Sequence, residues 1–151
     1  FKDFASSLSS DQALQAAGLV GRNVVAPVNY GLLAAGGDVS GEVNLPSSAS
    51  NVTVRVTNAS TGAPVKTLEL GPQASGTLPF SWNGIGIDGT FANPGVYKVQ
   101  VEASMGGQNV SLQPYMKSRV ESVVMGNGQR GLEVNLAGTG PVSFSRLTKI
   151  I

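Results

Sequence analysis

Apolar and polar residues alternate along most of the chain, and this period of two predicts short β-strands. The clearest run is 51–57, in which Val52, Val54 and Val56 face one side while the polar residues between them face the other. Residues 96–103 alternate in the same way. The other predicted strands are 23–28, 39–45, 65–70, 77–82, 110–113, 117–125, 131–136 and 142–147. The pattern therefore predicts an all-β protein.

A helix is predicted only near the start of the chain. A Ser-x-x-Gln pattern at 9–12 lets each side chain bond the backbone N–H of the other residue, and it introduces a helix over 12–17. Gly18 is expected to end that helix in the left-handed conformation. Because so short a helix is unstable by itself, it must pack against this domain or against another segment.

The predicted strands fall into two groups. Residues 38–104 hold five or six strands with turns every 8–12 residues, which is typical of a small antiparallel sandwich. Residues 110–151 hold four more strands, and the single strand in 19–30 must pair with a neighbour. We therefore expect three units, which are a tail with a short helix at 1–18, a discontinuous barrel at 19–37 plus 105–151, and a sandwich inserted at 38–104.

Glycine-rich segments mark the expected junctions between these units. The chain contains 20 glycines and 8 prolines, as expected for many turns between short strands. Two Gly-rich segments, 31–38 and 104–109, are the expected crossing points between barrel and sandwich. Paired connectors suit an inserted domain, because the two ends of a domain often lie close together.

The composition excludes most catalytic and metal-binding chemistry. There is no cysteine and no histidine, so disulfides, thiolate metal sites, cysteine nucleophiles and histidine bases cannot form. The nine carboxylates are scattered along the sequence, and no motif of an activated serine occurs. We expect a protein that is not an enzyme and that uses no cofactor or metal.

The charge balance narrows the range of partners. Ten basic and nine acidic residues give a net charge of +1, which is too balanced for a nucleic-acid footprint or an anionic-membrane patch. No apolar run approaches the ~20 residues that span a bilayer. No nucleic-acid or membrane partner is expected. The low charge and the absence of cysteine favour an exported bacterial protein.

Three motifs invite a functional interpretation, and each has a structural alternative. G-x-G-x-x-G patterns occur at 84–89 and 126–131, but neither opens a helix, so turn glycines are expected rather than a phosphate site. Asp88 stands without other carboxylates nearby, so it is expected to stabilise a turn rather than bind calcium. Trp82 shares a face with Phe80, which favours a core position over a sugar-stacking platform.

Several of these segments together resemble one bacterial family. LELG at 68–71, FSWNG at 80–84 and NPGVY at 93–97 resemble the pattern tLdLG, F.WDG and P.G.Y of the flagellar hook-capping proteins. ALQAAGLVGRNVV at 13–25 is similar to the family's A..LiGr.V segment, and 131–150 matches its closing strands. The resemblance covers essentially the whole chain. One departure is Asn83, where the family usually has Asp, and a turn tolerates that exchange.

The resemblance implies a tudor-like small β-barrel with an inserted fibronectin-type-III or Ig-like β-sandwich. It also implies a non-enzymatic scaffold outside the cell, which caps the distal tip of the growing hook and holds hook subunits while they polymerise. The cap is expected to be a ring-like homo-oligomer, namely a pentamer. Family members carry a longer N-terminal segment, so this chain is expected to be the C-terminal core.

We expect the contact residues for self-association to be apolar side chains of the N-terminal segment, because that segment is too short to fold alone. The candidates are Phe1, Phe4, Leu8 and Leu14. The alternative function is an extracellular module that binds carbohydrate or another ligand through Trp82 or the loop at 84–90. Burial of the tryptophan would exclude it as a stacking platform.

Overall fold

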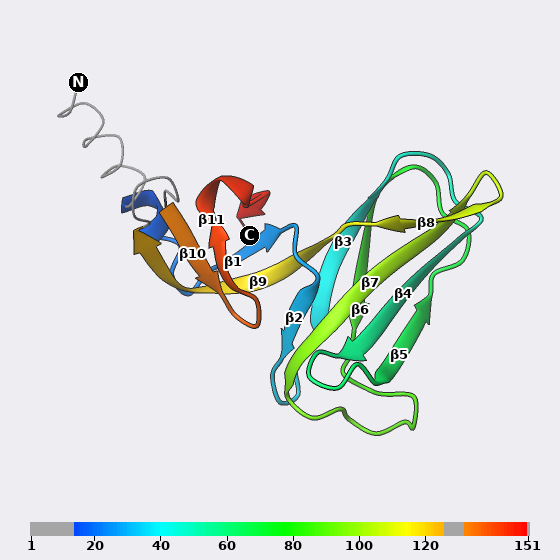
Figure 1. Ribbon diagram of the computed structural model, residues 1–151, viewed down its shortest axis with the longest axis horizontal. Coiled ribbons are helices and arrows are strands. Elements are labelled where there is room, and N and C mark those ends of the chain that lie inside the picture. The colour runs from blue at the N-terminus through cyan, green and yellow to red at the C-terminus, as the bar shows by residue number, and fades with distance from the viewer. Residues whose placement is uncertain (1–13, 126–131, 151) are drawn as a thin grey trace.

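The computed structural model describes residues 14–125 and 132–150, which form antiparallel strands joined by turns (Figure 1). Helical structure in these residues is limited to one turn at 14–17 and a short 3-10 helix, η1. The all-β prediction is confirmed. In chain order the elements are β1 (Asn23–Ala26), β2 (Tyr30–Leu33), β3 (Val39–Leu45), β4 (Asn51–Asn58), β5 (Pro64–Glu69), β6 (Gly76–Trp82), β7 (Gly95–Met105), β8 (Gln108–Leu112), β9 (Pro114–Met125), β10 (Leu132–Leu136), β11 (Gly140–Ser143), η1 (Phe144–Arg146) and β12 (Lys149–Ile150).

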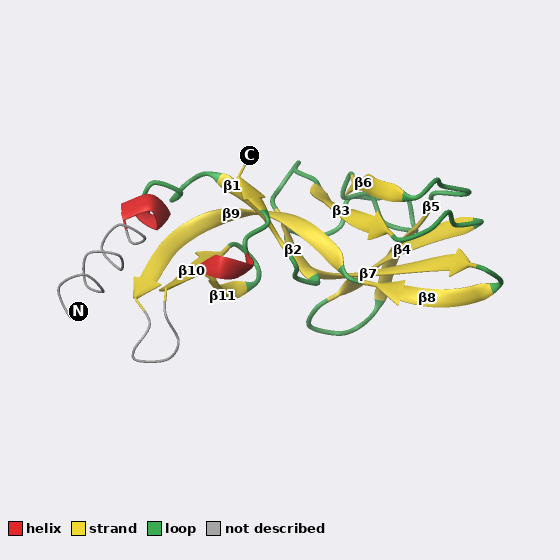
Figure 2. Cartoon of the chain, turned by 90° about the horizontal axis from the view of Figure 1, so that it is seen from above, coloured by secondary structure: helices red, strands yellow, loops and turns green. Residues whose placement is uncertain are grey.

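The strand β9 runs through both halves of the molecule. It belongs to a seven-stranded sheet with the order β11-β10-β9-β1-β12, in which β3 also pairs with β9 and β6 pairs with β3. β9 pairs with β3 through Met116, with β1 through Ser118 and with β10 through Val123. Figure 2 shows this strand curving from one half into the other. Backbone hydrogen bonds of one continuous strand therefore hold the two halves together.

The first half is a β-sandwich. Its second sheet has five strands in the order β2-β7-β4-β5, with β8 also paired to β7, and it packs against β3 and β6. The alternation predicted for β4 is confirmed, because Val52, Val54 and Val56 are at most 1% exposed. Trp82 of β6 and Val43 of β3 close the same core from the other sheet. Burying each of these valines contributes roughly 1.5–3 kcal/mol.

The second half is a curled half-barrel made of β1, β10, β11, β12 and the end of β9. Its core is separate from that of the sandwich and includes residues of the helical turn. Ala16 and Leu19 are 0% and 5% exposed, so this turn packs onto the half-barrel. The Gly21 N–H donates to the carbonyl of Val120 at 2.8 Å, which ties the segment to β9. Packing therefore supplies the stability that so short a helix lacks.

The predicted end of the helix is wrong. Gly18 is not among the residues with positive φ, whereas Gly21 has a φ of 87°. The Gly18 N–H still donates to the carbonyl of Leu14 at 3.1 Å, and Leu19 N–H donates to Ala16 at 2.9 Å. The chain thus continues turning past Gly18. The residue with left-handed backbone conformation is Gly21, where the segment hydrogen-bonds to β9.

The segment 31–38, expected to be a plain connector, contains most of β2. This strand pairs with β7 and so belongs to the sandwich sheet. Its small residues have a packing role, because a Cβ on Gly31 would lie 2.5 Å from Cγ1 of Val39. A short apolar strand rich in glycine is therefore easily mistaken for a linker.

The second expected connector, 104–109, is a hairpin between β7 and β8. Gly106 and Gly107 form its two-residue loop with φ values of 58° and 79°, which suit a type I′ turn. The strand predicted at 142–147 ends at Ser143 and continues as η1. In residues 14–125 and 132–150, no helix is long and apolar enough to span a membrane.

Candidate functional site

Trp82 lies inside the sandwich and not on its surface. The side chain is 1% exposed, and its ring meets that of Tyr97 edge to face, with centroids 5.1 Å apart and planes at 70°. Its Nε1–H donates to the carbonyl of Ile85 at 2.9 Å, so the polar atom is also satisfied. The prediction of a core tryptophan is confirmed, and Trp82 is excluded as a sugar-stacking platform.

The glycine motif at 84–89 forms turns in the loop between β6 and β7. Gly84 and Gly89 have φ values of 86° and 81°, in the left-handed region that favours glycine. No helix follows, so the geometry of a phosphate-binding loop is absent from this segment. The turn prediction is confirmed there. The second motif, at 126–131, lies outside the described residues.

Asp88 stabilises this loop. Its Oδ1 accepts hydrogen bonds from the backbone N–H of Thr90 at 3.0 Å and from the Thr90 hydroxyl at 2.8 Å. The backbone bond from Thr90, followed by the hydroxyl bond, lowers the pKa of the Asp88 carboxyl below its ordinary value. Asp88 is therefore a turn-stabilising residue, as predicted.

The stabilising effect of Asp88 should depend on pH. Because its pKa is lower in the folded state, the effect is present above the unfolded-state pKa of about 3.9 and is lost as the pH falls through the folded-state value. We expect the melting temperature of the wild type to fall more than that of Asp88→Asn below about pH 4. Thermal unfolding followed by circular dichroism at several pH values measures this, and identical pH profiles for the two proteins would contradict it.

The same loop presents two large apolar side chains to solvent. Ile87 is 69% exposed and Phe91 is 73% exposed. Phe91 stands between two hollows of about 540 and 350 Å³, one beside β5 and one beside the 34–37 turn. Sequence reasoning missed Phe91, although an apolar side chain within a Gly- and Asn-rich turn segment was a usable signal, whereas Ile87 lies in the loop at 84–90 that it named as an alternative ligand-binding loop. We call Ile87, Phe91 and the two hollows the tip surface.

Of the four residues predicted for self-association, only Leu14 is among the described residues. Its side chain is 73% exposed at the start of the helical turn. Phe1, Phe4 and Leu8 lie outside the described residues. The structure therefore places Leu14 on the surface of the half-barrel end of the molecule.

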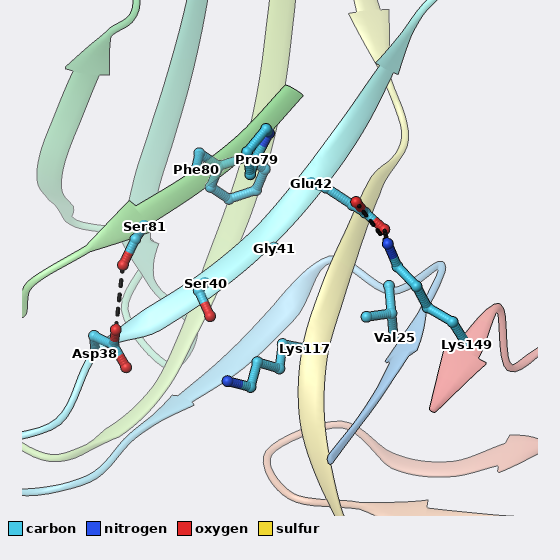
Figure 3. A pocket seen from close by; sticks show the side chains of 10 residues that line it. All are labelled: Val25, Asp38, Ser40, Gly41, Glu42, Pro79, Phe80, Ser81, Lys117 and Lys149. Carbon is cyan, nitrogen blue, oxygen red and sulfur yellow. Dashed lines mark hydrogen bonds and ion pairs between the residues drawn. The ribbon is translucent and has the colours of Figure 1, made fainter. Parts of the chain in front are cut away.

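A groove of about 500 Å³, lined by both apolar and charged residues, lies where the sandwich meets the half-barrel (Figure 3). Glu42 of β3 and Lys149 of β12 form an ion pair across it at 2.9 Å. Lys117 of β9 lines the same groove, and its side chain extends toward the side of Asp38 and Ser40, away from this ion pair. Glu42, Lys117 and Lys149 are far apart in sequence and meet only because β9 brings the two halves together. No sequence pattern therefore predicted this groove.

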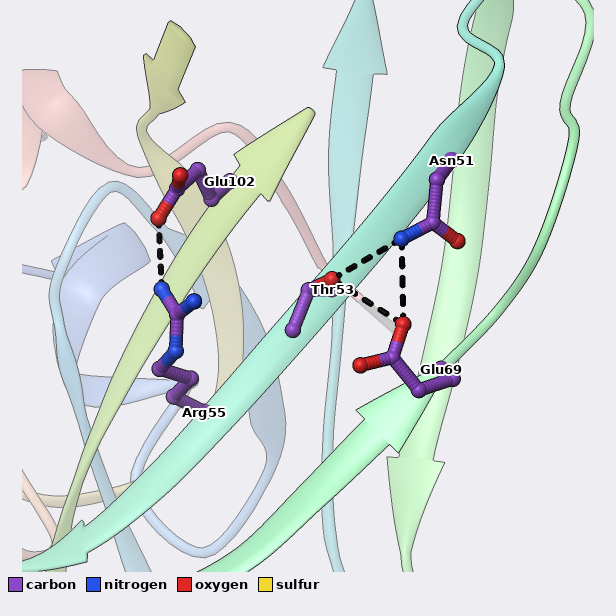
Figure 4. Close-up of polar contacts among 5 residues, drawn as sticks. All are labelled: Asn51, Thr53, Arg55, Glu69 and Glu102. Atoms are coloured by element: carbon purple, nitrogen blue, oxygen red, sulfur yellow. Dashed lines mark hydrogen bonds and ion pairs between the residues drawn. The ribbon is translucent and has the colours of Figure 1, made fainter. Parts of the chain in front are cut away.

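The carboxylates of the sandwich face separate polar partners. On the outer face of the five-stranded sheet, Glu102 pairs with Arg55, while Glu69 accepts bonds from Asn51 at 3.0 Å and from Thr53 at 3.2 Å (Figure 4). Within the described parts of the chain, no three His, Cys, Asp or Glu side chains gather into a metal-binding group. These contacts join neighbouring strands of the sheet, so they are structural hydrogen bonds and ion pairs.

Comparison with known proteins gives a consistent result. The FlgD Ig-like domain family matches residues 28–107. The basal-body rod modification protein FlgD of Escherichia coli is 32% identical over 143 residues, which cover 89% of this chain and 61% of that protein. The chain thus spans less than two thirds of this relative.

Two solved structures agree in fold and sequence. FlgD from P. aeruginosa superposes with a TM-score of 0.80 at 34% identity, covering 88% of this chain and 98% of that one. FlgD from Xanthomonas campestris superposes with a TM-score of 0.79 at 30% identity, covering 93% of this chain and 99% of that one. That structure is associated with the hook capping essential for flagellar assembly. The fold agrees with these similarities, since a sandwich with a buried Trp82 is joined to a half-barrel by β9. The similarities show that the chain belongs to the FlgD family.

Proposed function

We propose that this chain is the core of a non-enzymatic hook cap, which holds hook subunits at the growing tip of the flagellar hook while they polymerise. The observation that carries the proposal is the similarity to FlgD of Xanthomonas campestris along 93% of the chain. That protein is associated with hook capping essential for flagellar assembly. The hook subunit is accordingly the proposed partner, and the proposed location is the distal tip of the hook, outside the cell.

The surface chemistry supports a scaffold with exchangeable contacts. Charged residues make up 13% of the chain, and the two ion pairs found among the described residues, Arg55–Glu102 and Glu42–Lys149, lie partly exposed. Such pairs contribute little to binding or stability. A cap must release each subunit after placing it, and a surface with few strong charge pairs favours release.

The chain is proposed to consist of a discontinuous barrel with an inserted sandwich. The two separate apolar cores support this division. We propose wider limits for the sandwich than the 38–104 expected from the sequence; the pairing of β2 and β8 with β7 and the family match over 28–107 support this. The chain then passes from one unit to the other between β1 and β2, and it returns within β9, which pairs with β3 near Met116 and with β10 near Val123.

A deletion strain tests the proposed function. Without the gene, cells should lack hooks and release hook subunits into the medium, and the full-length gene should restore hooks. Electron microscopy of the cells and immunoblots of the medium against the hook subunit measure both effects. Normal hooks in the deletion strain would refute the proposal. Binding of carbohydrate is a weaker candidate, because its main aromatic residue, Trp82, is buried.

Self-association into a ring, with five subunits as the proposed number, is assigned to the N-terminal apolar residues. Leu14 is exposed, as a contact residue in the isolated chain should be. We expect Phe4→Ser with Leu8→Ser to weaken self-association of the full-length protein, because apolar contact area is lost. Sedimentation velocity measures the change, with Val124→Ser in the half-barrel as a control at another exposed apolar position. An unchanged sedimentation coefficient in the double variant would rule these residues out.

A further inference from the structure

The loop that carries the tip surface is held in one conformation by its own hydrogen bonds. The Gly86 N–H donates to Thr90 at 2.9 Å and the Ala92 N–H donates to Gly84 at 2.7 Å, which closes a small hairpin. The Ile87 N–H donates to the carbonyl of Val65 at 2.9 Å and fastens the hairpin to β5. Because the loop is already ordered, it loses little conformational entropy when it binds a partner.

This ordered hairpin exposes its largest apolar side chains instead of burying them. Ile87 and Phe91 are exposed to 69% and 73%, whereas Ala92, the residue after Phe91, packs against the core of the sandwich. Leu33, Pro94 and Ala92 add apolar walls to the hollow on one side of Phe91. Exposed apolar side chains grouped beside hollows are typical of protein–protein contact sites, in which an aromatic anchor is surrounded by pockets for the partner.

The charge around the tip surface limits what can bind there. Asp88 is the charged residue in the lining of the two hollows, and it lines the same hollow as Ile87. A complementary partner therefore presents apolar side chains to the hollows and a basic side chain to Asp88. A nucleic acid or an acidic surface would be repelled by the charge of this carboxylate.

The position of the tip surface separates it from the end assigned to self-association. In Figure 1 the loop between β6 and β7 lies at the opposite end of the sandwich from the β7–β8 hairpin, and far from the half-barrel segment that begins at Leu14. A cap needs one surface for its own copies and another for the subunits that it places. These two ends of the molecule supply distinct surfaces.

We propose that the tip surface is the docking site for an apolar segment of the hook subunit, with a basic side chain of that segment facing Asp88. The inference rests on the proposed function and adds the surface and the chemistry of the contact. Phe91 and Ile87 are the anchors, and the two hollows receive the side chains of the partner.

The test uses the full-length gene in the deletion strain. The variant Ile87→Ser with Phe91→Ser should be exported at the wild-type level yet leave cells without hooks, because each lost anchor weakens the contact by about tenfold. Val124→Ser, which changes a 42% exposed valine on β9, should restore hooks as the wild type does. Circular dichroism of the purified proteins checks that all three are folded.

A second measurement identifies the partner directly. A photo-crosslinking amino acid at position 91 should give a product that antibodies against the hook subunit recognise, and the same residue at position 124 should not. Normal hook numbers in the tip variant, or crosslinks only between copies of this chain, would overturn the inference while leaving the capping function intact. Failure of the wild-type gene to restore hooks would instead refute the proposed function.

Discussion

Replacing Trp82 with alanine lowers the free energy of unfolding by about 3–5 kcal/mol, the range for removing a large aromatic side chain from a core. The indole is 1% exposed, so its removal leaves a cavity between the two sheets that the rigid strands cannot fill. The edge-to-face contact with Tyr97 is also lost. The carbonyl of Ile85 loses the donor that now lies 2.9 Å away.

Urea unfolding followed by circular dichroism measures this loss, with two reference variants. Trp82→Phe keeps an aromatic ring but not the hydrogen bond, so it should be less harmful than alanine. Phe91→Ala removes another aromatic ring at a position that is 73% exposed and should change the free energy of unfolding little. Equal losses at positions 82 and 91 would show that burial in the sandwich core is not what makes Trp82 important.

Gly41→Ala lowers the free energy of unfolding by about 2–3 kcal/mol, the upper part of the range for overpacking. A Cβ at this position would lie 2.7 Å from the carbonyl oxygen of Tyr115 and 2.9 Å from the sulfur of Met116. Both neighbours belong to β9 where it pairs with β3, so relief requires the two strands to separate. The gain of about 1 kcal/mol from replacing a flexible glycine offsets only part of this cost.

Gly18→Ala is the matched control, because its Cβ would meet its nearest neighbour at 3.4 Å, an ordinary contact, and its φ is not positive. It should leave stability unchanged or raise it slightly, as alanine favours the helical turn. Differential scanning calorimetry of both variants measures the contrast. Equal stability of the Gly41 and Gly18 variants would mean that β3 and β9 are not closely packed at this crossing.

Much of the fold could be predicted because it follows from local alternation. Val52, Val54 and Val56 of β4 alternate with polar residues, and a strand with that pattern can bury only one face, so its core side was predictable. The same argument placed Trp82 inside, on the face that it shares with Phe80. Turn glycines such as Gly84, with a φ of 86°, were predictable because no helix follows their motif.

The candidate site was harder to predict, because exposure depends on what covers a residue. Leu14 and Phe91 are both 73% exposed, yet only the former was expected at a surface used for binding. Nothing in the local sequence around Phe91 shows that its hairpin is fastened to β5 with the ring outside. The expected connectors at 31–38 and 104–109 contained strand residues for a similar reason, since pairing with β7 outweighed their small, Gly-rich composition.

The sequence by itself determined the all-β class, most of the strands, the buried face of β4 and the core position of Trp82, because alternation acts through neighbouring residues. It also carried the resemblance to the hook-capping family. Only the tertiary structure decided that β9 joins two cores, that Glu42 meets Lys149 across a groove, and that Ile87 and Phe91 remain exposed. These features depend on contacts between segments far apart in the chain, which no local pattern records.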